Sequence, residues 1–189
     1  MNATLPQRTA LMSPRAAGLL FNFIAFQLGW FACVVGAARG WPLTGTAIGA
    51  LIVAWHIVRA ARPREELKLI GVALLIGVLW DSALIVLGLT DFTSGTLLAG
   101  LAPPWILALW ALFATTLNLS LRWLRQRWLL AALLGAVAGP LSYWAGARLG
   151  AVQLVEPWPA LIALGIGWSL MTPVLVIAAS RYDGVHATA

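Results

Sequence analysis

Charged residues are scarce in this sequence: only 10% of its 189 residues are Asp, Glu, Lys or Arg, whereas 61% are hydrophobic. A soluble domain usually contains about 25% charged residues, so this chain has too little polar surface to cover a globule in water. The single cysteine excludes a disulfide-stabilised domain, and the high apolar fraction excludes an intrinsically disordered chain. The composition therefore predicts an integral membrane protein.

Residues that carry common enzyme chemistry are also scarce. The sequence has two histidines and no pair of His or Cys residues at metal-ligand spacing, so we expect neither a metal nor another cofactor. Residues 139–143 (GPLSY) do not match the Gly-x-Ser-x-Gly motif of serine hydrolases, and no phosphate-binding glycine motif occurs. Because the basic residues lie between apolar runs, nucleic acid is not an expected partner either.

Long apolar runs make up most of the chain. A bilayer core about 30 Å thick is crossed by roughly 20 helical residues, and six runs reach this length. We predict an all-α bundle of six transmembrane helices over residues 17–180, between an N-terminal segment (1–16) and a C-terminal tail (181–189). The longest connector, residues 59–68, leaves no room for a soluble domain. The predicted helices lie at about 17–37, 41–58, 69–89, 98–121, 128–147 and 158–179.

The basic residues are unequally divided between the two sides that six spans define. The side without the termini carries only Arg39 and Arg148. Since Lys and Arg are enriched on the cytoplasmic side of membrane proteins, both termini are predicted to be cytoplasmic. The basic residues on that side are Arg8, Arg15, Arg59, Arg62, Arg64, Lys68, Arg122, Arg125, Arg127 and Arg181.

Each predicted span has one face with small or polar residues, which we expect to point into the bundle. Close helix packing alone explains most of the glycines and serines on these faces. Pro140 and Pro173 lie inside the last two spans and are candidate kinks. The side chains that could contact a ligand are Asn22, His56, Asp81, Asn118, Ser142, Ser169 and Thr172.

Asp81 is the most unusual of these residues. It lies about 13 residues into the third span, on the order of 20 Å from the cytoplasmic edge. An Asp near the centre of a span costs roughly 2.5–3.5 kcal/mol. No Lys, Arg or His lies at a matching depth, so two interpretations stay open. Asp81 is either a neutral group that hydrogen-bonds to hydroxyls such as those of Ser142 or Ser169, or a proton or cation site.

His56 ends the second span at a depth like those of Asn22 and Asn118, so these three could form one polar cluster at a cytoplasmic mouth. His56 is the candidate catalytic residue, although a histidine that meets water at the interface explains the position as well. It differs from Asp81 by about 15 Å in depth, which argues against a direct acid-base pair.

Four strings carry a family resemblance: residues 26–34 (FQLGWFACV), 80–82 (WDS), 116–124 (TLNLSLRWL) and 139–143. They resemble a bacterial inner-membrane family known only as a domain of unknown function, over nearly the whole chain after about residue 17. The resemblance implies a multi-pass protein of the bacterial inner membrane, with an accessory role in membrane-lipid modification beside enzymes such as cyclopropane fatty acid synthases. It implies no catalytic residues.

Two looser likenesses concern shape and composition. The substrate-capture components of energy-coupling-factor vitamin transporters are similar in size and span count. The tryptophan-rich sensory proteins share the excess of tryptophan, which occurs 11 times here, and a Pro-Trp segment at Pro104 and Trp105. They look like five-helix proteins, which argues against membership.

Three functions stay open at this point. The first is binding or transport of a small lipophilic or lipid-derived ligand, with Asp81 supplying the polar contact. The second is an intramembrane enzyme, or a subunit of one, that acts on acyl lipid through His56, Asn22 and Asn118. The third is a structural partner of another membrane protein. The scarcity of polar residues in the predicted interior favours binding or transport over catalysis.

Overall fold

A computed structural model describes residues 13–186. Most of the predicted N-terminal segment, including Arg8, and the last three residues of the predicted C-terminal tail lie outside the described residues.

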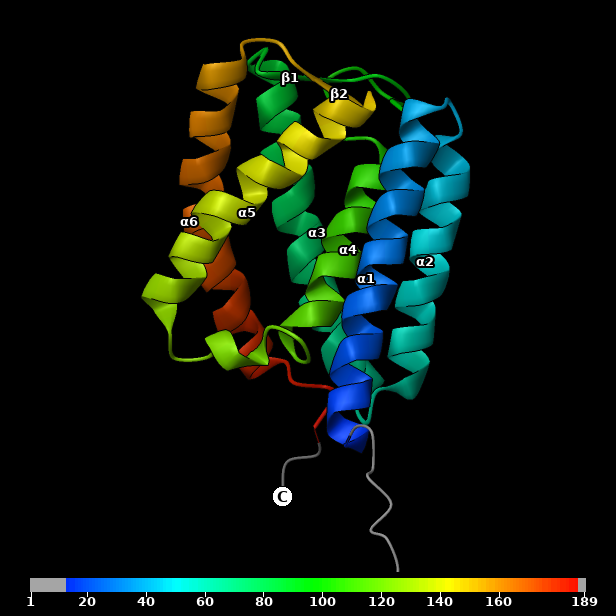
Figure 1. The fold of residues 1–189 in the computed structure, drawn as a ribbon, viewed down its shortest axis with the longest axis vertical. Coiled ribbons are helices and arrows are strands. Elements are labelled where there is room, and N and C mark those ends of the chain that lie inside the picture. The colour runs from blue at the N-terminus through cyan, green and yellow to red at the C-terminus, as the bar shows by residue number, and fades with distance from the viewer. Residues whose placement is uncertain (1–12, 187–189) are drawn as a thin grey trace, which may run out of the picture.

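Within residues 13–186, six α-helices run alternately up and down between two ends of a bundle (Figure 1). The prediction of an all-α fold is confirmed there, apart from two short strands. Of these helices, five are long and apolar enough to cross a membrane, whereas α4 is apolar but has only 14 residues, so the six-span count is confirmed in part. The helices are α1 (Pro14–Ala38), α2 (Pro42–Arg59), α3 (Pro63–Val86), α4 (Pro104–Leu117), α5 (Trp128–Leu149) and α6 (Pro157–Arg181).

Proline defines where most of these helices begin, because its fixed φ suits the first helical position and its missing N–H costs no hydrogen bond there. The start of α3 shows how such a proline changes a helix boundary. The helix begins at Pro63 with Glu65 and Glu66 in its first turn, where carboxylates are favoured by the helix dipole. The predicted boundary at residue 69 is therefore too late. The predicted connector shrinks to residues 60–62, and Glu66 belongs to a helix rather than a loop.

The fourth helix is much shorter than the predicted span of residues 98–121. Pro103 and Pro104 prevent a helical start before residue 104, and after Leu117 the chain turns into a short 3-10 helix, η1 (Arg122–Leu124). The helix packs against α1, α2 and α3, and its Trp105 and Leu112 are almost completely buried.

The two strands were not predicted. β1 (Thr90–Phe92) follows α3 and β2 (Val152–Leu154) follows α5, and they pair antiparallel with Asp91 opposite Gln153. The pair lies at the top of Figure 1 and ties together two loops that are far apart in the sequence. Each strand has three residues, too short to show the alternating pattern that identifies a strand in a sequence.

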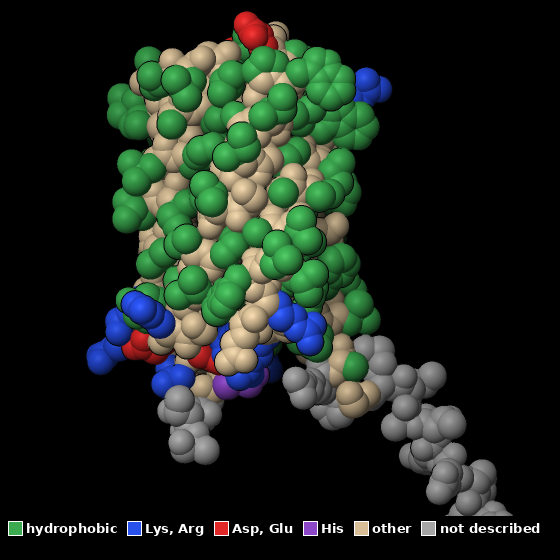
Figure 2. Space-filling model, turned by 90° about the vertical axis from the view of Figure 1, so that its left-hand side faces the viewer, with side chains coloured by type: hydrophobic (Ala, Val, Ile, Leu, Met, Phe, Trp, Pro, Cys, Tyr) green, Lys and Arg blue, Asp and Glu red, His purple; other side chains and the backbone are tan. Residues whose placement is uncertain are grey.

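Charge divides the two ends of the bundle. Figure 2 shows Lys and Arg side chains gathered at one end, which we call the basic end, and hydrophobic side chains over the side of the bundle. Large apolar residues such as Leu79, Leu129 and Leu170 are exposed along the helices, as expected where lipid or a partner covers them. Arg39 and Arg148 lie at the opposite end. The basic end carries Arg59, Arg62, Arg64, Lys68, Arg122, Arg125, Arg127 and Arg181.

Glycine allows the closest helix contacts. A Cβ atom on Gly45 would lie 2.4 Å from the carbonyl oxygen of Ala32, where α1 and α2 cross. A Cβ atom on Gly135 would lie 2.2 Å from the carbonyl oxygen of Trp168, where α5 meets α6. These two helix pairs form the sides of the bundle, and α4 lies between them.

Candidate functional site

A cavity of about 510 Å³ lies between α1, α4, α5 and α6. Its size falls in the range of roughly 300–1,000 Å³ that is common for small-molecule sites. Among the described residues, no Asp, Glu, Lys, Arg or His lines it. Aromatic side chains make up much of its wall, and they are Phe23, Phe26, Trp30, Phe31, Trp110, Phe113, Tyr143 and Trp168.

The cavity opens through the side of the bundle, between α1 and α5. Phe23 and Phe31 of α1 and Leu134 and Leu141 of α5 line the cavity and are also exposed on the surface. All four belong to helices that are long and apolar enough to cross a membrane. The opening therefore faces the same surroundings as the apolar side of the bundle.

Asp81 lies behind the wall of this cavity and does not line it. Its side chain is fully buried. Trp110 Nε1 donates a hydrogen bond to Asp81 Oδ2 at 2.7 Å, and the hydroxyl of Tyr143 donates to Asp81 Oδ1. Trp110 can reach the carboxyl group because its ring lies against Gly77, one turn before Asp81 on α3, where a Cβ atom would be 2.4 Å from the ring. The carboxyl group thus holds two aromatic side chains of the wall in place.

The predicted partners of Asp81 are wrong. Ser142 accepts a hydrogen bond from Trp30 Nε1 at 3.0 Å, which links α1 to α5. Ser169 donates to the carbonyl oxygen of Ile166 in its own helix at 2.6 Å. The residues that face Asp81 from α4 and α5 carry an indole and a phenol, so these groups supply the donors.

The predicted ligand residues Ser142 and Thr172 line the cavity, and Ser169 does not. The hydroxyl of Thr172 is buried without a hydrogen-bond partner among the described residues, close to Gly135. Asn22 donates to the carbonyl oxygen of Thr115 at 3.2 Å and accepts from Ser120, which lines the cavity. Asn22 thus contacts the cavity only through another side chain.

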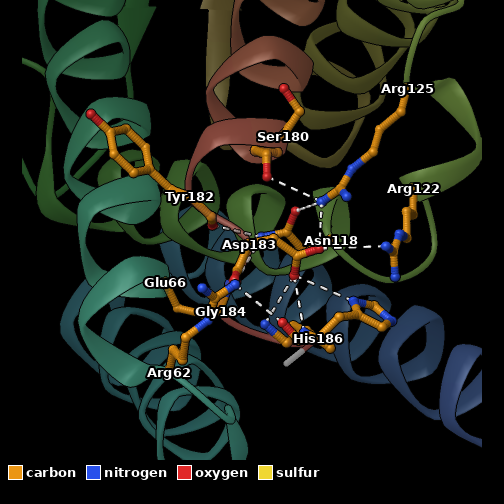
Figure 3. A network of polar contacts seen from close by, with 12 residues as sticks. Arg62, Glu66, Asn118, Arg122, Arg125, Ser180, Tyr182, Asp183, Gly184 and His186 are labelled. Carbon is orange, nitrogen blue, oxygen red and sulfur yellow. Dashed lines mark hydrogen bonds and ion pairs between the residues drawn. The ribbon is translucent and has the colours of Figure 1, made fainter. Parts of the chain in front are cut away.

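A second polar site lies at the basic end, around Glu66 (Figure 3). The Glu66 side chain is fully buried, with Oε2 2.7 Å from His56 Nε2. Its Oε1 accepts hydrogen bonds from Asn118 Nδ2 at 2.7 Å and from the backbone N–H of Gly184 at 2.9 Å. One carboxylate therefore joins α2, α3, the end of α4 and the chain after α6. His56 and Asn118 meet here, whereas Asn22 does not join them.

The chain after α6 folds back across the basic end (Figure 3). Asp183 Oδ2 lies 3.0 Å from Arg125 and 3.6 Å from Arg122, and Arg62 donates to the backbone carbonyl oxygens of Asp183 and His186. Burial alone would raise the pKa of the Asp183 carboxyl, but hydrogen bonds from the backbone N–H of His186 and from Arg125 lower this pKa below its ordinary value. Asp183 is therefore ionised at neutral pH and attracts the arginines.

A family model described as a protein of unknown function (DUF2878) matches residues 19–174. The chain belongs to this family. The predicted membership of a family of unknown function is thereby confirmed. No curated protein and no solved structure matches the chain.

The two sites of this DUF2878 protein differ in how much of each lies within the matched residues. Every residue that lines the cavity lies within residues 19–174, and so does Asp81. Part of the basic-end site lies beyond it, because Asp183 and Gly184 follow the matched region. The cavity is therefore formed entirely by the region that defines the family.

Several residues of these sites were missed in the sequence, among them Glu66 and Gln27. Glu66 was assigned to a loop, although Pro63 followed by acidic residues is a signal for a helix start. Gln27 lies inside the string of residues 26–34 and lines the cavity of this DUF2878 protein. A polar residue in the middle of an apolar run is the signal that could have identified Gln27. Within residues 13–186, no group of three or more His, Cys, Asp or Glu side chains is arranged to hold a metal ion.

Proposed function

We propose that this protein binds a small lipophilic or lipid-derived molecule in the cavity between α1, α4, α5 and α6. The observation that carries the proposal is the aromatic wall of the cavity together with its opening between α1 and α5. Small-molecule sites are concave and mostly apolar, with a few polar groups that orient the ligand. An opening in the apolar side of the bundle admits molecules that dissolve in the bilayer. Transport of the ligand, or an accessory role in membrane-lipid modification, would use the same site.

Asp81 affects ligand binding indirectly, through two neighbouring side chains. Its carboxyl oxygens accept hydrogen bonds from Trp110 and Tyr143, and both of these side chains line the cavity. Asp81 therefore fixes the shape of the wall rather than contacting the ligand. His56 is engaged with Glu66 at the basic end and does not line the cavity, so the proposal gives it no catalytic role.

Filling the opening should remove the ligand. Ala138 on α5 lines the cavity and is exposed, so Ala138→Phe places a ring in the mouth without overpacking the core. Each protein is purified in detergent, and the small molecules and lipids that remain bound are identified by mass spectrometry. We expect a defined ligand in the wild type and at least about tenfold less in Ala138→Phe, the effect of roughly 1.4 kcal/mol of lost affinity.

Val137→Phe is the matched control. Val137 is the preceding residue on α5, is exposed and does not line the cavity. It should retain the ligand at the level of the wild type. Finding only the same bulk phospholipids in all three preparations would contradict the proposal and would direct attention to protein partners.

We also propose that the helices cross the bacterial inner membrane with the basic end in the cytoplasm. The uneven distribution of Lys and Arg between the two ends supports this orientation. A membrane-impermeant thiol reagent on intact cells should label Glu156→Cys at the opposite end and should label Arg127→Cys only after lysis. Both positions are exposed, and the native Cys33 is buried. The reverse labelling pattern would overturn the orientation.

A further inference from the structure

Gln27 is a polar side chain of the cavity that lacks a partner. It lies near the middle of the 25-residue helix α1, four residues from both Phe23 and Phe31, which also line the cavity. The side chain is partly buried, and no described residue forms a hydrogen bond with its carboxamide. An amide in apolar surroundings is unfavourable unless its donor and acceptor are hydrogen-bonded. A ligand in the cavity can supply the missing partner.

Other polar side chains of the wall are already engaged. Tyr143 donates to Asp81, Ser142 accepts from Trp30, and Thr116 donates to a carbonyl oxygen of its own helix at 2.6 Å. The hydroxyl of Thr172 and the indole N–H of Trp168 have no partner among the described residues, but both atoms are almost completely buried. Gln27 is therefore the group in the wall whose donor and acceptor are both available to a ligand.

The charge of the wall restricts the ligand further. A carboxylate or phosphate taken into an apolar site needs a cation or several donors to replace its hydration. Among the described residues, the cavity has no Lys, Arg or His in its wall. A carboxamide both donates and accepts, which suits an uncharged hydroxyl or carbonyl group. An anionic lipid head group does not fit this chemistry.

We infer that the cavity takes an uncharged single-chain lipid whose hydroxyl or carbonyl oxygen hydrogen-bonds to the carboxamide of Gln27. This inference rests on the proposed function and names the class of its ligand. The apolar chain lies along the aromatic wall formed by Trp110, Phe113 and Trp168. The cavity has a volume of about 510 Å³, which is in the range of sites that hold drug-sized molecules and therefore suits a lipid of this class.

The test compares two radiolabelled probes of equal chain length, hexadecanol and palmitate, at pH 8, where palmitate is ionised. Equilibrium binding is measured on the full chain in detergent, and binding to Ala138→Phe is subtracted as background. We expect hexadecanol to bind the wild type at least about tenfold more tightly than palmitate, because the wall offers an anion no cation. Gln27→Leu should weaken hexadecanol binding about five- to tenfold, the loss of one or two neutral hydrogen bonds.

Gln153→Leu supplies the matched control, because it makes the same change at an exposed position on β2 outside the cavity. It should bind both probes like the wild type. Palmitate binding as tight as hexadecanol binding, or hexadecanol binding unchanged by Gln27→Leu, overturns the inference. If neither probe binds above background, the inference is also overturned. The proposed function is judged separately by the ligand that co-purifies with the wild type and is lost in Ala138→Phe.

Discussion

Glu66→Ala is expected to lower the thermal stability of the protein strongly. The side chain is fully buried and contacts His56, Asn118 and the backbone of Gly184, which belong to three different segments. Removing the carboxylate leaves buried donors without an acceptor. Loss of one partner from a buried ionic and hydrogen-bonded group costs about 3–5 kcal/mol. For a chain of this length, we expect the melting temperature to fall on the order of 10 °C.

Glu65→Ala is the control, because it also removes one carboxylate but not the buried contacts of Glu66. Glu65 is the preceding residue in α3 and pairs with the exposed Lys68 at 2.8 Å. Exposed pairs of this kind contribute about 0–1 kcal/mol, so the melting temperature should change little. Both variants are measured in detergent by the loss of helical circular dichroism on heating. Equal shifts for Glu65→Ala and Glu66→Ala would show that the contacts of Glu66 do not stabilise the fold.

Glu66→Gln should lie between Glu66→Ala and the wild type. The amide keeps an acceptor oxygen for Asn118 and Gly184 but loses the charge beside His56. Hydrogen bonds to charged groups are stronger than those between neutral groups, so part of the stability is lost. The order of the three melting temperatures therefore separates the contribution of the acceptor from that of the charge.

The helices of this protein were largely predictable because hydropathy is a local property of the sequence. Apolar runs of about 20 residues, separated by Arg or Pro, correspond to the five long helices. The bounds of α3 and α4 were less accurate, since they depend on where Pro63 and Pro104 allow a helix to begin. The pairing of β1 with β2 depends on loops that meet only in the folded bundle.

The partners of the polar residues were not predictable in the same way. Asp81 was recognised as costly because its depth follows from the sequence. The identity of its donors depends on which faces of α4 and α5 meet α3, and on the space at Gly77 that lets Trp110 approach. The meeting of His56 and Asn118 at Glu66 likewise requires the end of α4, whose position hydropathy does not define.

Two Gly→Ala substitutions in this protein are expected to change stability in opposite directions. Gly135 on α5 faces α6 so closely that a Cβ atom would lie 2.2 Å from Trp168 O and 2.3 Å from Thr172 Oγ1. One of these is a backbone atom that cannot rotate away, so Gly135→Ala must separate the helices. Overpacking of this kind costs about 1–3 kcal/mol, and the backbone clash puts this variant at the upper end or beyond it.

Gly71 on α3 is the matched case, because a Cβ atom there would meet nothing within 4 Å. Alanine is favoured over glycine in a helix by about 0.8–1.0 kcal/mol, so Gly71→Ala should raise the melting temperature by a few degrees. Gly135 also lines the cavity, so separating α5 from α6 should reduce bound ligand in Gly135→Ala. Gly71 does not line it, so Gly71→Ala should bind like the wild type. Melting curves and co-purifying ligand are measured on both variants. A Gly135→Ala protein that melts like Gly71→Ala would contradict the close contact of α5 with α6, and with it the shape of the cavity between them.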